Sequence, residues 1–263
     1  MDLRIILDGW RFDEEEEANN VRKIIGLDRR PKLQIRLRDG VIQWEVDGPP
    51  SGDCPYGCQS VLAYCKRLVQ GLSSAEPASE SVDFRLDDAL LDELESELND
   101  YTKRRQAFLL IGDYYHALRD ALHALEILEF VREWVDDSGV VFHFDRGRPA
   151  IIADRAHAEA FLGIQGQQLQ QAVRALSKGV EEIEEFFQYH ALAGQIPKSL
   201  ERRALIDLRR SLRERYNVPL TDAELLHTLR AEQQVAIEQE NYEMAARLRD
   251  KIGILRQRME GTR

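Results

Sequence analysis

The sequence predicts a mostly helical α+β protein with a small antiparallel sheet near its N-terminus. Two short segments in the first fifty residues alternate between apolar and polar residues, which is typical of strands. From Leu86 onward, apolar residues recur at helical spacing, and a capping signal opens a last pair of short helices. We therefore expect three parts: a sheet with one helix over 1–70, a helical body over 82–216, and a two-helix hairpin over 221–260.

The predicted sheet is centred on Asp39-Gly40, a dipeptide common in tight hairpin turns. Apolar residues alternate on both sides of this turn, at Leu33, Ile35, Leu37, Ile42, Trp44 and Val46. A two-residue loop at Asp39-Gly40 would place Leu37 opposite Ile42 and all six side chains on one face of the sheet. A third strand is expected over residues 21–26.

The region between the sheet and the body should contain one helix and one linker. Residues 59–69 have an amphipathic helical pattern, and the polar, serine-rich residues 71–81 are typical of a boundary between structural parts. Further along the chain, residues 138–149 interrupt the helical pattern, so we expect an irregular insertion there.

The middle of the chain resembles the paired helices of tetratricopeptide repeats. Tyr101 and Phe108 fall where the first helix of such a repeat carries aromatic residues, and small residues recur in the helices that follow. Equivalent alanines, Ala117 and Ala172, lie 55 residues apart, whereas these repeats recur about every 34 residues. We therefore predict stacked helical hairpins and no regular array. Plain packed helices with alanine at close crossings remain the alternative.

Charge is distributed unevenly along the chain. The net charge is −11, yet residues 198–263 contain 14 basic and 11 acidic residues, a net charge of +3, which leaves −14 for the rest. An acidic body argues against a large nucleic-acid surface, because phosphate contacts require clustered Lys and Arg. The candidate nucleic-acid contacts are confined to Arg202, Arg203, Arg209 and Arg210. The alternative is a solvated, ion-paired helix face.

The last forty residues show the most informative pattern. Thr221 and Glu224 form a capping box, which predicts a helix starting near Asp222. A turn at Glu240-Asn241 then separates two narrow apolar stripes at helical spacing. Such short helices bury too little area to stand alone, so we expect the stripes to contact a partner. The predicted partner-binding residues are Leu229, Gln233, Ala236, Tyr242, Ala245, Leu248, Ile252 and Leu255. The alternative is that the stripe docks onto its own chain.

Residues 236–252 resemble the UVR motif. The resemblance implies the antiparallel helical hairpin by which excinuclease subunits B and C meet, and which has relatives in Clp-type unfoldases and in the activator of a bacterial arginine kinase. The implied partner is therefore a Clp-type unfoldase, an excinuclease subunit or a kinase, or a second copy of this chain. Gln233 departs from the motif, which usually has an apolar residue there, and this weakens the seam or adds pairing specificity.

No pattern in the sequence indicates a catalytic, cofactor or metal site. Cys54 and Cys58 are separated by three residues and no second pair occurs, and Cys65 lies in a helical stretch, so we expect no metal and no cofactor. The sequence lacks a secretory signal and a membrane-spanning run, which favours the cytoplasm. We therefore expect an adaptor that binds another protein. The alternatives are a nucleic-acid-binding accessory factor of nucleotide excision repair and an enzyme of unrecognised type.

Overall fold

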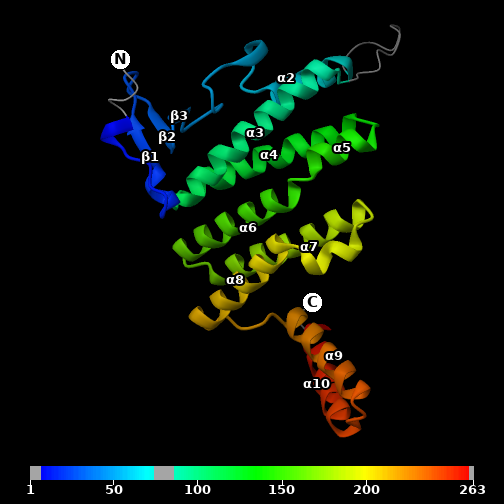
Figure 1. Ribbon diagram of the computed structural model, residues 1–263. Coiled ribbons are helices and arrows are strands. Elements are labelled where there is room, and N and C mark those ends of the chain that lie inside the picture. The colour runs from blue at the N-terminus through cyan, green and yellow to red at the C-terminus, as the bar shows by residue number, and fades with distance from the viewer. Residues whose placement is uncertain (1–6, 74–85, 261–263) are drawn as a thin grey trace. The chain divides into compact units, whose positions relative to one another are not determined.

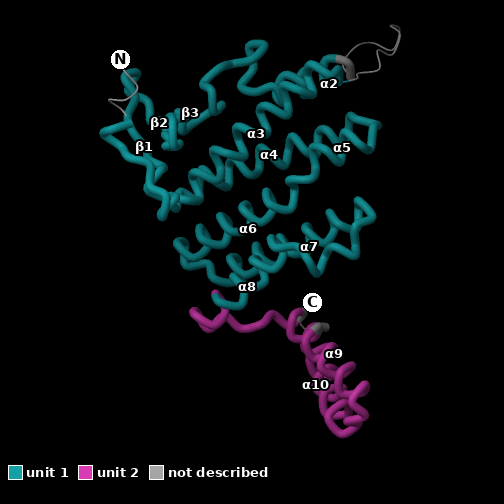
Figure 2. Tube along the Cα trace, viewed as in Figure 1, with its two compact units in different colours: residues 1–211 teal, residues 212–263 magenta. Residues whose placement is uncertain are grey.

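A computed structural model describes residues 7–73 and 86–260 of the chain (Figure 1). The chain divides into two compact units, residues 1–211 and residues 212–263 (Figure 2). It is mostly helical with one small antiparallel sheet, as the sequence predicts. Within the described ranges, no helix combines the length and the apolar character needed to cross a membrane.

The sheet contains three antiparallel strands in the order β1-β2-β3, which span Val21–Ile25, Pro31–Leu37 and Gly40–Glu45. The predicted third strand is therefore confirmed, but the predicted register of the hairpin is wrong. Leu37 pairs with Gly40, so the turn consists of Arg38 and Asp39. The observed partner of Leu37 lies two residues before the predicted partner, Ile42. Because side chains alternate with a period of two, the same apolar face is kept.

The side chain of Arg36 explains why the turn lies there. Its Nε donates a hydrogen bond to the carbonyl oxygen of Trp10 at 2.7 Å, and its Nη1 donates to those of Arg38 and Gly40, each at 3.1 Å. The guanidinium thus satisfies carbonyl groups that a tight turn leaves without partners. Gly40 does not adopt a positive φ, so the turn does not use the conformation that the Asp-Gly pair suggested.

One face of the sheet packs against the helices of the body. The buried residues of this core come from the sheet region and from three helices, and are Val21, Leu33, Trp44, Val46, Ala107, Phe108, Ala117 and Ala158. A buried ion pair lies beside them. Arg104 donates to Asp120 from Nε at 2.6 Å and from Nη2 at 2.8 Å, and both side chains are fully buried. Arg104 Nη1 also donates to the carbonyl oxygens of Glu45 and Gly48, each at 2.9 Å, and so holds the end of β3.

The remainder of the first unit consists of helices arranged in layers (Figure 1). Their bounds are Val61–Ser73 for α2, Asp88–Leu110 for α3, Tyr114–Trp134 for α4, Ser138–Asp145 for α5, Arg148–Gln165 for α6, Leu169–Tyr189 for α7 and Leu200–Tyr216 for α8, the last of which continues into the second unit. The pairs α3–α4 and α6–α7 are helical hairpins, as predicted. The α3–α4 pair alone spans 47 residues, which is longer than a tetratricopeptide repeat of about 34.

The sequence predicts two connecting segments, residues 138–149 and residues 71–81, and in both of them the structure contains helix. Residues 138–149 are not irregular, because they contain α5 and the start of α6. Asp137 caps α5 by accepting hydrogen bonds from the backbone N–H groups of Gly139 at 2.7 Å and Val140 at 3.2 Å, which favours a helix despite the glycine. The predicted linker at 71–81 begins inside α2, and its residues 74–81 lie outside the described residues.

Candidate protein-interaction site

The C-terminal hairpin consists of α9, Asp222–Glu238, and α10, Tyr242–Glu260. The predicted capping box is confirmed. Thr221 Oγ1 accepts a hydrogen bond from the N–H of Glu224 at 3.3 Å, and the Glu224 carboxylate accepts one from the N–H of Thr221 at 2.9 Å. These two bonds satisfy two backbone donors that no intrahelical acceptor reaches, so the first helix begins where the sequence places it.

Glu224 is also bound by Arg213, whose Nη2 lies 2.5 Å from Oε1. Partial burial by itself would raise the pKa of Glu224. The hydrogen bonds from Arg213 and Thr221 outweigh this effect and lower the pKa to about 2. The carboxylate therefore stays charged at neutral pH and ties the start of α9 to the end of α8.

The start of α10 is also capped by a side chain. Asn241 Oδ1 accepts a hydrogen bond from the N–H of Met244 at 3.2 Å and caps the helix. Arg247 and Glu243 form an exposed ion pair one helical turn apart, with Arg247 Nη2 2.7 Å from Glu243 Oε1. Tyr242, the first residue of α10, leaves 68% of its surface exposed. A partner can therefore reach this ring without opening the hairpin.

The apolar stripes of the two helices face each other inside the hairpin. The buried seam contains six of the eight predicted partner-binding residues: Leu229, Ala236, Ala245, Leu248, Ile252 and Leu255. Gln233 is half-buried and donates a hydrogen bond from Nε2 to the carbonyl oxygen of Ala245 at 3.3 Å. The structure thus brings the stripes together in one seam, and only Tyr242 of the predicted set is well exposed. Whether a partner opens this seam stays a prediction.

Four exposed apolar side chains surround the turn of the hairpin, and we call them the apolar tip: Val235, Ile237, Tyr242 and Met244. Each exposes between 43% and 68% of its surface. At 100° per residue, Val235 and Ile237 lie on either side of the inward-facing Ala236. Sequence reasoning identified only Tyr242, because the others fall outside the stripe. In the sequence, these residues can be recognised as apolar residues that stand directly beside an inward-facing position of the stripe.

Comparison with known families assigns the hairpin. The family model described as the UvrB/uvrC motif matches residues 223–258, which is nearly the whole of α9, the turn and α10. The hairpin is a UVR motif. The resemblance seen at residues 236–252 is thereby confirmed, and the UVR hairpin lies within the second compact unit of the chain. No curated protein and no solved structure matches the chain, so the resemblance to tetratricopeptide repeats is not confirmed.

The candidate nucleic-acid contacts lie on α8, and most of them already have partners. Arg202 Nε lies 2.5 Å from Glu184 Oε1, Arg209 Nη1 donates to Ser177 Oγ at 3.0 Å, and Arg210 lies 3.3 Å from Asp207. The fourth candidate, Arg203, is exposed. The pairs of Arg202 and Arg210 with carboxylates fit the ion-paired helix face that was the alternative, because each neutralises a positive charge that a phosphate contact would require.

The cysteines do not form a site. Cys54 is exposed, Cys58 is partly exposed and Cys65 is buried, and all three are free thiols. Burial raises the pKa of Cys65 to about 11, so its thiol is protonated at neutral pH and is a weak nucleophile. Among the residues that the structure describes, no cluster of three or more His, Cys, Asp or Glu side chains could hold a metal ion.

Proposed function

We propose that this chain is an interaction protein that recruits another protein through its UVR hairpin. The observation that carries the proposal is the match of residues 223–258 to the UVR motif, over a segment that folds as a helical hairpin. UVR motifs join proteins in excision repair, and related hairpins serve unfoldases and a kinase activator. A cytoplasmic adaptor with one such module fits both the motif and the surrounding helical body.

The apolar tip is the surface that we propose for the contact. The seam residues cover one another, so they are closed to a partner, whereas four apolar side chains gather in the open beside the turn. Glu238, Glu240 and Glu243 lie between or beside them in the sequence. A matching partner surface has an apolar depression with basic residues at its rim. An excinuclease subunit, a Clp-type unfoldase, a kinase and a second copy of this chain are the candidates.

The experiment is a binding series with the full-length chain immobilised for biolayer interferometry. The analytes are purified excinuclease subunits B and C, a Clp-type unfoldase, an arginine kinase and the chain itself. The double variant Tyr242→Lys/Met244→Lys should weaken binding of the true partner by at least about tenfold, because it places charge in the apolar contact. Ile254→Lys is the matched control, because Ile254 is 70% exposed on the same helix but far from the turn.

The outcomes separate the proposal from its competitors. Equal affinity of both variants for every analyte that binds would reject the apolar tip as the contact. Binding of none of the analytes would reject the proposed partners. A titration of the chain with duplex DNA at several salt concentrations tests the excision-repair alternative, since phosphate contacts require affinity to fall steeply with salt.

A further inference from the structure

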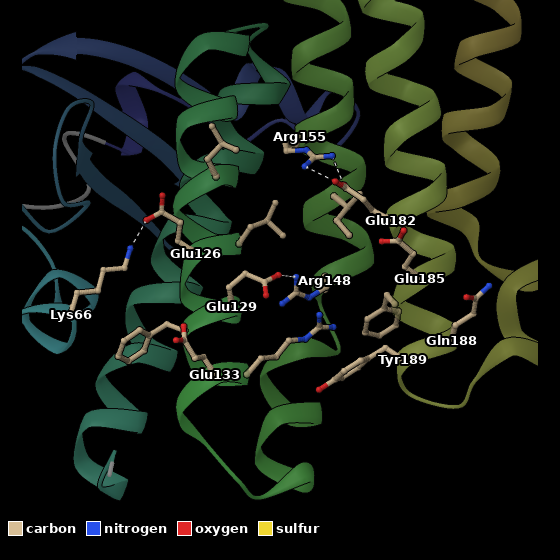
Figure 3. A pocket seen from close by; sticks show the side chains of 16 residues that line it. Lys66, Glu126, Glu129, Glu133, Arg148, Arg155, Glu182, Glu185, Gln188 and Tyr189 are labelled. Atoms are coloured by element: carbon tan, nitrogen blue, oxygen red, sulfur yellow. Dashed lines mark hydrogen bonds and ion pairs between the residues drawn. The ribbon is translucent and has the colours of Figure 1, made fainter. Parts of the chain in front are cut away.

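A groove of about 900 Å³ lies within the first unit (Figure 3). Helix α6 supplies its floor, while α4 and α7 supply the two walls, and Lys66 of α2 lies at one end. The volume is at the upper end of the range for sites that bind small molecules, and it is large enough for a short peptide. Nothing in the proposed function uses this groove.

Both walls of the groove carry rows of glutamate. On α4, Glu126, Glu129 and Glu133 follow spacings of three and four residues, so they share one helix face. On α7, Glu182 and Glu185 are three residues apart and also share one helix face. Figure 3 shows the two rows on opposite sides of the groove. Helical periodicity therefore places two acidic rows along one channel.

The cations of the groove are already neutralised by the protein. Lys66 pairs with Glu126 at 3.0 Å, and Arg155 donates to Glu182 at 3.2 Å. Arg132 donates to the buried Asp145 at 2.8 Å. The fourth cation, Arg148, also pairs with Asp145, through Nε at 2.6 Å, and with Glu129.

Two acids in the walls remain without such partners. Glu133 and Glu185 are exposed, and neither carboxylate forms an ion pair or hydrogen bond with any part of the chain that the structure describes. They come from opposite walls, α4 and α7. The uncompensated charge of the groove is therefore negative on both sides, and a cationic occupant would be attracted to it.

The floor of the groove, in contrast to its walls, favours a hydrogen-bond acceptor. Arg148 is 6% exposed, and its Nη2 is buried without a hydrogen-bond acceptor in the described chain. A buried guanidinium N–H without an acceptor is destabilising, because it has given up its hydrogen bonds to water. A carbonyl oxygen of an occupant seated on the floor would supply this acceptor. Polyamines and simple cations cannot do so, whereas every peptide unit can.

The groove also offers apolar surface to an occupant. Leu122 on α4 is 44% exposed, and Tyr189 on α7 is 62% exposed. The guanidinium of Arg132 lies over the Tyr189 ring, 4.3 Å from its centroid, which holds the ring at the edge of the groove. An occupant that covers both side chains must carry apolar groups as well as positive charge.

We propose that this groove binds a segment of another protein that is rich in Lys or Arg and also carries apolar side chains. In the complex, two Lys or Arg side chains of the bound segment pair with Glu133 and Glu185. A main-chain carbonyl oxygen of the segment accepts a hydrogen bond from Arg148, and one of its apolar side chains covers Tyr189. The floor from Arg148 to Arg155 rises over seven residues, or about 10 Å, the length of about three residues of extended peptide. The strongly acidic first unit would steer such a segment towards the groove.

Fluorescence anisotropy with the full-length chain tests this proposal. The probe is a fluorescein-labelled peptide of alternating Lys and Leu, compared with peptides that carry Glu in place of Lys or Ser in place of Leu. We expect the Lys-Leu peptide to bind at least about tenfold more tightly than either counterpart. Its affinity should also fall as salt is raised, because the wall carboxylates are exposed.

Variants localise the binding to the groove. Glu133→Gln/Glu185→Gln should weaken the Lys-Leu peptide by at least about tenfold, since it removes both free charges. Asp136→Asn/Glu181→Gln is the matched control, because it removes the same charge from exposed residues outside the groove and should change affinity by less than about twofold. Equal loss in both double variants, or displacement of the peptide by an equal concentration of spermidine, would overturn the proposal. The UVR hairpin is intact in all these variants, so this test is independent of the proposed function.

Discussion

Gln233 of α9 donates a hydrogen bond across the UVR hairpin to the main-chain carbonyl oxygen of Ala245 in α10. It is the polar member of a seam that is otherwise apolar, and it stands where the motif usually has an apolar side chain. A polar contact in a helix–helix seam stabilises less than an apolar one but fixes how the two helices are aligned. The departure from the motif thus has a structural explanation.

Gln233→Leu should stabilise the hairpin by about 1 kcal/mol, because leucine adds apolar burial in the seam. The carbonyl of Ala245 keeps its helical hydrogen bond, so no acceptor is left unsatisfied. Hydrogen exchange of the amides of residues 222–260 in the full-length chain measures this local stability. Gln233→Ala is the control and should lower it. Faster exchange in the leucine variant would mean that the hydrogen bond, and not the packing, holds the helices together.

Glu224 makes the hairpin sensitive to acid. Its pKa in the folded chain is about 2, below the ordinary value of 4.5, so the unfolded state binds a proton first as pH falls. The stabilisation is complete above about pH 5 and is lost as the pH falls towards 2. A carbon-13 NMR titration of the Glu224 carboxyl should give a midpoint near 2, and Arg213→Ala should raise it. A midpoint near 4.5 in the unaltered chain would contradict the ion pair.

Local patterns in the sequence were sufficient to predict most of the fold. Alternation placed the apolar face of the sheet, and the capping box placed the start of α9. The register of the sheet hairpin was missed because it depends on the side chain of Arg36, which donates to the carbonyl oxygens of Leu37, Arg38 and Gly40. Helix α5 was missed because residues 138–149 interrupt the helical pattern of apolar residues, whereas the cap supplied by Asp137 favours a helix there.

The candidate sites were harder to predict, for a physical reason. Periodicity identifies the apolar face of a helix but not what covers it, so the stripes of α9 and α10 gave no sign that they cover each other. The groove is even harder to predict from the sequence. Glu133, Arg148 and Glu185 become neighbours only through the packing of three helices, and no spacing along the chain reports that arrangement.

The buried pair of Arg104 and Asp120 should be essential to the first unit. Both side chains are fully buried, so removing Asp120 leaves the buried charge of Arg104 without its carboxylate partner. Asp120→Ala should cost about 3–5 kcal/mol, while Arg104→Met/Asp120→Leu should recover much of that loss. Urea denaturation followed by circular dichroism measures both. If the double variant were no more stable than Asp120→Ala, the hydrogen bonds of Arg104 to Glu45 and Gly48 would be the dominant contribution.

Two glycines inside helices should respond to alanine with opposite signs. A Cβ at Gly179 in α7 would lie 2.7 Å from Ala156 Cβ and 2.9 Å from Leu205 Cδ1, so a packed neighbour must move. Gly179→Ala should therefore destabilise the chain by about 1–3 kcal/mol, although alanine favours helix. A Cβ at Gly253 in α10 meets nothing within 4 Å, so Gly253→Ala should stabilise α10 by about 0.5–1 kcal/mol. Urea denaturation measures the first change, and hydrogen exchange over residues 242–260 measures the second. Changes of the same sign would show that helix propensity or packing alone governs both positions.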